Sequence, residues 1–136
     1  MRQDLVVPHL VDYLTQRCGV QEADISIVIA NGTHEGGDEQ ELRTLVTDAV
    51  YDRVRVENHD CEATDLVYLG TTPHGTPVSI NRTAAQADIV ICLGAVTHHV
   101  MAGFGGGRKS ILPGISSRET IFHLSLIHIS EPTRHS

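Results

Sequence analysis

Two short apolar runs constrain the fold of this chain more than any other feature. They read DISIVIANG at residues 24–32 and ADIVICLGAV at residues 87–96, and each leads directly into a glycine-containing loop. Runs of this length that are rich in β-branched residues are typical of strands buried on both faces of a parallel sheet. We therefore predict two buried strands whose carboxyl ends open into loops.

Helical patterns alternate with these runs. Apolar residues recur at helical spacing in residues 8–18, where Pro8 is acceptable in a first turn. Residues 36–50 carry their acidic side chains at the end where a helix N-terminus favours them. Residues 116–123, SSRETIFH, begin with serines suited to cap a helix.

Further strands complete the pattern. Residues 53–58, RVRVEN, alternate as a strand does. Residues 65–82 contain two strand-like runs on either side of the turn PHGT, which predicts a β-hairpin, or a pair of strands at the edge of the sheet. This alternation predicts an α/β fold with a mostly parallel sheet flanked by helices. Ligands of such sheets bind beyond the carboxyl ends of the strands. We therefore expect the loops at 30–37 and 94–109 to meet at one ligand-binding edge.

Composition limits the class of protein. A chain of 136 residues suits one domain, and its net charge of −7 argues against nucleic-acid binding, which needs a clustered basic face. No run approaches the roughly 18 apolar residues of a membrane span, and no signal peptide is visible. Cys18, Cys61 and Cys92 are too widely spaced for a zinc site and fit a reducing compartment. The expected location is the cytoplasm, with no nucleic-acid or membrane partner.

The loop GFGGGRK carries the clearest binding signal. Gly105, Gly106 and Gly107 leave backbone N–H groups open to a ligand, and Arg108 and Lys109 add positive charge. The spacing is not that of a Walker A loop. This pattern is compatible with two interpretations, a flexible loop and a binding loop for phosphate or carboxylate.

Three histidines lie in the predicted ligand-facing loops. They are His34 and the adjacent His98 and His99, whereas His9, His59 and His74 suit surface or structural roles. Adjacent side chains usually point apart, so only one of the pair is expected to face the pocket. The pattern itself does not choose between them.

Together, ANGTH and ADIVICLGAVTHHVMAGFGGGRKSILPGISSRETI resemble the nickel-pincer lactate racemase family over roughly residues 5–123. The resemblance implies an isomerase, with this chain an incomplete N-terminal domain of a two-domain enzyme whose active site lies between the domains. It also implies a small 2-hydroxy acid as substrate and, for the parent protein, cofactor-synthesis proteins as partners.

The resemblance implies roles for individual residues. His34 and His99 match the two catalytic acid/base histidines, and His98 has no assigned role. Lys109 matches the lysine that carries the nickel-pincer nucleotide covalently, with Gly105, Gly106 and Gly107 beside that cofactor. Such chemistry removes the α-hydrogen as hydride, and two imidazoles serve the two enantiomers because imidazole titrates near neutral pH.

The ends of the chain depart from the family pattern. Ser125 stands where the pattern calls for a nickel-ligating histidine, and LSLIHISEPTR back-translates to a transposase-type sequencing adapter. We therefore expect residues 1–123 to be a partial domain and residues 124–136 to be an assembly artefact. His128 and His135 in this tail are not proposed as metal ligands. Met1 is expected to be internal to a longer gene, and the chain as written is expected to be poorly soluble and inactive as a racemase.

Two other functions remain as alternatives. One is a binding module that holds a phosphorylated molecule through the glycine loop, Arg108 and Lys109 without catalysis. The other is a zinc hydrolase that uses His34, His98 and His99, although adjacent histidines make poor joint ligands compared with an HExxH helix.

Overall fold

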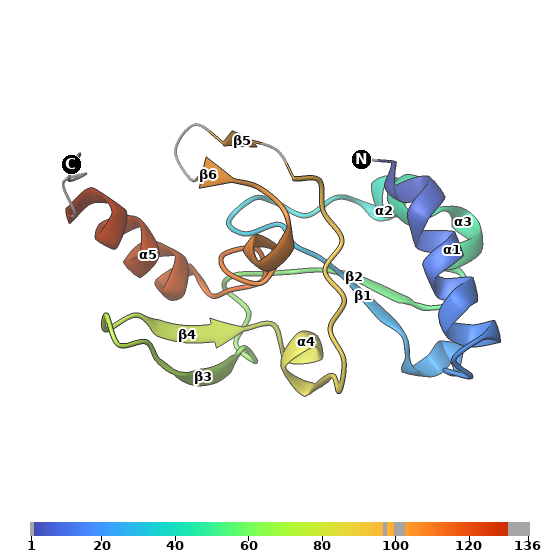
Figure 1. Cartoon of the computed structure of the whole chain (residues 1–136), viewed down its shortest axis with the longest axis horizontal. Helices are drawn as coiled ribbons and strands as arrows, with labels where there is room; N and C mark the ends of the chain where they lie inside the picture. The colour runs from blue at the N-terminus through green and yellow to red at the C-terminus, as the bar shows by residue number, and fades with distance from the viewer. Residues whose placement is uncertain (1, 97, 100–102, 131–136) are drawn as a thin grey trace. The chain divides into compact units, whose positions relative to one another are not determined.

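The computed structural model describes residues 2–96, 98, 99 and 103–130. The chain divides into two compact units. The first comprises Met1–Ile29 and Glu35–Asn58, and the second comprises Ala30–His34 and His59–Ser136. Helices and small sheets occur in both, so the prediction of an α/β fold is confirmed (Figure 1).

The first unit consists of three α-helices, a short 3₁₀ turn and a parallel pair of strands. Its elements are α1 (Gln3–Gln16), η1 (Glu22–Asp24), β1 (Ser26–Ile29), α2 (Glu39–Val46), α3 (Asp48–Tyr51) and β2 (Arg55–Asn58). β1 pairs with β2 in parallel, with Ile27 opposite Val56. α1 packs against α2 and α3, and the three helices lie together in Figure 1.

Helix α1 begins earlier than the sequence predicts. Pro8 lies inside the helix rather than in its first turn. A proline there removes one backbone hydrogen bond. Val7 and Val11 lie one turn apart on either side of it and are both buried in the core, so their burial favours a helix that continues through Pro8.

The buried core of the first unit consists mainly of valines. Its buried members are Val7, Val11, Ile25, Val46, Val50 and Val54. At the edge of this core, Arg53 donates to Asp12 at 2.8 Å and to Glu22 at 2.6 Å. These ion pairs tie the start of β2 to α1 and η1, and they hold the pKa of Arg53 above its usual value.

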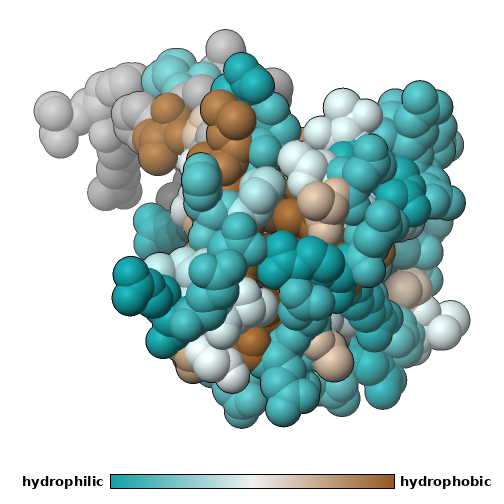
Figure 2. Space-filling view, turned by 90° about the vertical axis from the view of Figure 1, so that its right-hand side faces the viewer, coloured by the Kyte–Doolittle hydropathy of each residue, from teal (hydrophilic) through white to brown (hydrophobic). Residues whose placement is uncertain are grey.

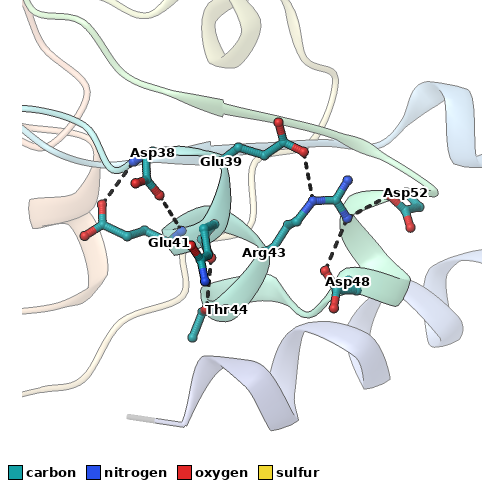
Figure 3. A network of polar contacts seen from close by, with 8 residues as sticks. Asp38, Glu39, Glu41, Arg43, Thr44, Asp48 and Asp52 are labelled. Carbon is teal, nitrogen blue, oxygen red and sulfur yellow. Dashed lines mark hydrogen bonds and ion pairs between the residues drawn. The ribbon is translucent and has the colours of Figure 1, made fainter.

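Helix α2 has a complete N-terminal cap (Figure 3). The Asp38 carboxylate accepts from the Glu41 amide at 2.8 Å, and the Glu41 carboxylate accepts from the Asp38 amide at 3.0 Å. The prediction that acids mark this helix start is confirmed. Further along, Arg43 contacts Glu39, Asp48 and Asp52, which raise its pKa, and it stacks over Tyr51 at 4.3 Å.

The second unit contains a hairpin, the short helical segments α4 and η2, the longer helix α5 and a pair of two-residue strands. Its elements are β3 (Val67–Thr71), β4 (Pro77–Ile80), α4 (Arg82–Gln86), β5 (His98–His99), β6 (Gly103–Phe104), η2 (Gly107–Ser110) and α5 (Arg118–Ser130). β3 and β4 are antiparallel, which confirms the predicted hairpin. Of the three two-stranded sheets in the described part of the chain, only β1–β2 is parallel.

Hydrogen bonds join α5 to β4. The Thr120 hydroxyl is fully buried, donates to the Pro77 carbonyl at 2.8 Å and accepts from the Ser79 amide at 3.1 Å. The Ser117 side chain accepts from the Thr120 amide at 3.1 Å, so the expected serine cap of this helix is present. α5 continues to Ser130, and residues 131–136, which include Pro132 and His135, lie outside the described residues.

The second predicted buried strand is absent. Residues 87–96 form no regular secondary structure, and Ile89 and Val96 are 79% and 77% exposed. An apolar run becomes a strand only where a neighbour supplies hydrogen bonds. Here β1 and β2 pair only with each other among the described strands, and β1 itself is half-buried rather than buried.

The surface seen in Figure 2 is mostly hydrophilic, with smaller hydrophobic patches between. Within the described ranges, no helix is both long and apolar enough to cross a membrane.

Candidate functional site

The loop that carries His34 is a tight turn. Gly32 adopts a φ of +60°, which favours glycine, and the His34 amide donates to the Asn31 carbonyl at 3.0 Å. His34 itself is exposed. The turn therefore presents the imidazole at the surface of the second unit.

The glycine loop forms a second turn. Gly106 has a φ of +80°, and a Cβ at this position would lie 2.7 Å from the Ala95 carbonyl oxygen. A glycine is thus required at position 106, because the backbone of Ala95 lies too close to leave room for a side chain. The Lys109 amide donates back to the Gly106 carbonyl at 3.2 Å, which places Lys109 one turn into η2.

Gly114 joins the two turns. Its amide donates to the Lys109 carbonyl at 3.0 Å, and its carbonyl accepts from the Gly32 amide at 2.8 Å. A Cβ on Gly114 would overlap the Ser110 carbonyl oxygen, so no larger residue fits without a backbone shift. One small residue therefore connects the His34 turn to the Lys109 turn.

A cavity of about 400 Å³ lies between these segments. Its lining residues are Ala30, Asn31, Gly32, Thr33, His34, Gly105, Gly106, Lys109, Ser110, Pro113, Gly114 and Ile121. No Asp or Glu is among them, so Lys109 meets no carboxylate on this lining. An ammonium group, an imidazole and open backbone suit an anionic ligand such as a carboxylate or a phosphate.

Most of the predicted site residues meet here. His34, Gly105, Gly106 and Lys109 share the lining, although the expected meeting at a sheet edge did not occur because residues 87–96 form no strand. Gly107 is exposed and is not on the lining.

The histidine pair is only partly described. His98 and His99 form β5, which pairs with β6, and His98 is exposed. The side chain of His99 lies outside the described part of the structure. Ser125 is exposed, and its hydroxyl donates to the Ile121 carbonyl at 3.0 Å within α5.

Sequence reasoning did not single out Asn31, Ser110 or Gly114. Asn31 belongs to the ANGTH motif, and the Pro-Gly pair at 113–114 is a common turn signal that could have drawn attention to Gly114. His59 suited a structural role from sequence and is indeed buried.

A larger cavity of about 690 Å³ lies within the first unit. Its lining includes Asp4, Asp38 and Glu41, and the last two carboxylates are already engaged in the α2 cap. These acids disfavour an anionic ligand. The cavity beside Lys109 is therefore the better candidate site.

No group of three or more His, Cys, Asp or Glu that could hold a metal ion occurs among the described side chains. The zinc hydrolase alternative therefore gains no support from the part of the chain that the structure describes.

The chain matches one family model over nearly all its length. The model, described as the lactate racemase N-terminal domain, matches residues 1–135. Lactate racemase of Thermoanaerobacterium thermosaccharolyticum is 34% identical over 118 residues, and that of Lactiplantibacillus plantarum is 35% identical over 118 residues. Each match covers 86% of this chain and 27% of the relative. The chain thus spans about a quarter of the length of these curated relatives.

Two solved structures have a similar fold. The lactate racemase apoprotein of Thermoanaerobacterium thermosaccharolyticum superposes with a TM-score of 0.77 at 33% identity, covering 85% of this chain and 28% of that one. A protein from Thermotoga maritima superposes with a TM-score of 0.74 at 26% identity, covering 95% of this chain and 35% of that one.

Proposed function

Because the chain belongs to the lactate racemase N-terminal domain family, we propose that it forms the cofactor-bearing part of a 2-hydroxy-acid racemase. Membership confirms the resemblance seen in ANGTH and GFGGGRK. The observation that carries the proposal is that His34 and Lys109 line one cavity whose lining contains no carboxylate. Racemisation itself is proposed for a protein that contains this domain, because the curated relatives are much longer.

The residues of the cavity fit a lysine-tethered nickel-pincer nucleotide. Lys109 is half-buried and offers a primary amine, and Gly105 and Gly106 present backbone with no Cβ against a bulky group. Lys109 would hold the group covalently. The chemistry that such a group supplies when bound is reversible hydride abstraction from C2 of a 2-hydroxy acid.

The imidazoles move the other hydrogen. The hydroxyl proton of the substrate must leave together with the α-hydrogen, and a ring nitrogen of His34 would accept it from one enantiomer. His99 would accept it from the opposite enantiomer, since each enantiomer presents its hydroxyl differently. The Lys109 tether would fix the reacting carbon against these bases.

The chemical setting agrees with a reducing compartment. Cys18, Cys61 and Cys92 are free thiols, and we place the protein in the cytoplasm with cofactor-synthesis proteins as partners.

One property makes the proposal directly testable: Lys109 is the only lysine in the sequence. Co-expression with the nickel-pincer synthesis proteins should add one nucleotide-sized mass to the intact chain, and peptide mapping should locate it at Lys109. Lys109→Arg keeps the positive charge and should abolish the adduct, whereas His34→Ala should retain it.

The outcomes separate the proposals. An unmodified chain, in cells where a full-length lactate racemase is loaded, would contradict a cofactor role for this cavity. A chain that instead binds inorganic phosphate through Lys109 and never acquires the adduct would favour the binding module that lacks catalysis. The absence of carboxylates on the lining is the observation that keeps this second candidate open.

A further inference from the structure

We propose that His59 is a positioning residue for this cavity: its buried imidazole fixes the segment after Lys109, while its backbone reaches the His34 loop. The inference rests on the proposed function for the role of Lys109. Its geometry stands independently of that function.

The first step is the burial of the imidazole. His59 is 3% exposed, and its Nε2 lies 2.9 Å from the carbonyl oxygen of Ser116. A carbonyl can only accept, so the ring donates through an Nε2–H. Buried hydrogen bonds of this kind are costly to lose, because the remaining carbonyl is left without a partner.

The second step links Ser116 to Lys109. Ser116 is fully buried; its hydroxyl donates to the Ile111 carbonyl at 2.9 Å, and its amide donates to the Pro113 carbonyl at 3.0 Å. The turn that these bonds close contains Gly114, whose amide donates to the Lys109 carbonyl. The His59 bond to Ser116 therefore anchors the turn that follows Lys109.

The third step links His59 to the other side of the cavity. The Asn31 side-chain amide lies 3.5 Å from the His59 carbonyl oxygen, at the limit of a hydrogen bond. The Asn31 carbonyl accepts a hydrogen bond from the His34 amide. The next residue, Gly32, donates its amide to the Gly114 carbonyl. One residue thus contacts both segments that line the cavity.

The other ring nitrogen argues against a role in packing alone. His59 Nδ1 is buried and has no hydrogen-bond partner among the residues that the structure describes. An unpaired buried nitrogen is unfavourable, so an apolar residue of similar size would pack better if only volume mattered. The bond from Nε2 to Ser116 is what the imidazole contributes.

Two amide replacements test the proposal. The side-chain nitrogen of Gln lies near the place of Nε2, and that of Asn lies near the place of Nδ1. His59→Gln should keep the bond to Ser116, and His59→Asn should lose it. Both variants keep a polar, uncharged side chain, so the comparison isolates the position of the donor.

Amide hydrogen exchange measured by NMR on the full 136-residue chain provides the first readout. In His59→Asn we expect the Gly32 and Gly114 amides to exchange about tenfold faster or more, as the loss of one buried hydrogen bond implies. The hydrogen-bonded amides of β1 and β2 should be unchanged, and His59→Gln should match the original chain.

Amine acetylation provides the second readout and needs no cofactor. With one lysine in the chain, Lys109 and the N-terminal amine are the two primary amines that acetic anhydride can convert to stable amides, and the N-terminal amine serves as the internal reference. The ratio of Lys109 to N-terminal labelling should rise toward its urea-unfolded value in His59→Asn and stay low in His59→Gln.

Three results would overturn the proposal. The first is that His59→Asn and the original chain show the same amide exchange and the same acetylation ratio. The second is that His59→Gln fails to restore protection. The third is that β1 and β2 lose protection in parallel, which would assign His59 to general stability. Cofactor loading at Lys109 is a separate measurement, so failure of the proposed function would not be confused with failure of this inference.

Discussion

The amide of Gly32 donates a hydrogen bond to the carbonyl of Gly114 at 2.8 Å, and this bond joins the turn before His34 to the turn after Lys109. Gly114 also donates to the Lys109 carbonyl at 3.0 Å. The spacing between the candidate base and the candidate tether therefore depends on backbone contacts at a residue that has no side chain.

Gly114→Ala should destabilise the second unit and separate these turns. Its Cβ would overlap the Ser110 carbonyl and lie 2.9 Å from the Lys109 carbonyl, and backbone atoms yield less easily than side chains. We expect a loss of about 3 kcal/mol in the free energy of unfolding, at the upper end of typical overpacking. Urea denaturation measures the loss, and hydrogen exchange at Gly32 should accelerate.

Gly75→Ala is the matched control. Gly75 has a φ of +83° with open space around its Cβ position, so only backbone strain of about 1 kcal/mol is expected. Exchange at Gly32 should not change in this variant. Equal effects of the two substitutions on Gly32 would contradict the role assigned to Gly114.

Thr120→Val should destabilise the chain although it preserves shape. The substitution removes the hydroxyl that donates to Pro77 and accepts from Ser79, and both backbone groups then lose a partner. The expected cost is about 2 kcal/mol by thermal or urea denaturation. Thr120→Ser should recover most of it. Thr44→Val should be nearly neutral, because the Thr44 hydroxyl is exposed and donates to the Gln40 carbonyl within α2. A neutral Thr120→Val would show that this buried network contributes little.

The pair formed by Arg2 and Asp4 predicts a pH effect of defined sign. The Arg2 guanidinium contacts Asp4 at 2.7 Å and lowers the pKa of that carboxyl below its usual value. Because the folded pKa is the lower one, the stabilisation is present above the unfolded pKa, about 4, and is lost as the pH falls through the folded pKa.

NMR titration of the Asp4 carboxyl measures this effect. Arg2→Ala should raise the pKa of Asp4 toward its ordinary value, and Arg17→Ala, at the opposite end of α1, should leave it unchanged. A pKa of Asp4 that is unaffected by Arg2→Ala would contradict the assignment.

Local signals predicted several elements well. The Asp38–Glu41 cap, the hairpin turn at Gly75 and the serine cap before α5 all depend on residues within a few positions of one another. The start of α1 was placed too late, because Pro8 suggested a boundary that the burial of Val7 and Val11 overrides.

The candidate site was predicted in its members but not in its construction. The motifs around His34 and Lys109 identified residues that share one cavity. The expected means of bringing them together, two buried strands ending at one sheet edge, was wrong for residues 87–96. The junction at Gly114 replaces that edge, and a Pro-Gly pair alone says nothing about which distant amide its carbonyl will accept.

The amino-acid sequence by itself determined the family, the local caps and turns, and the set of polar residues available for chemistry, because these depend on residue type and short spacing. Only the tertiary structure decided that residues 87–96 form no strand and stay exposed, that His59 is buried against Ser116, and that Gly32 meets Gly114. Each of these depends on whether a residue distant in sequence is present to form a hydrogen bond. The residue pattern along one segment does not identify that partner.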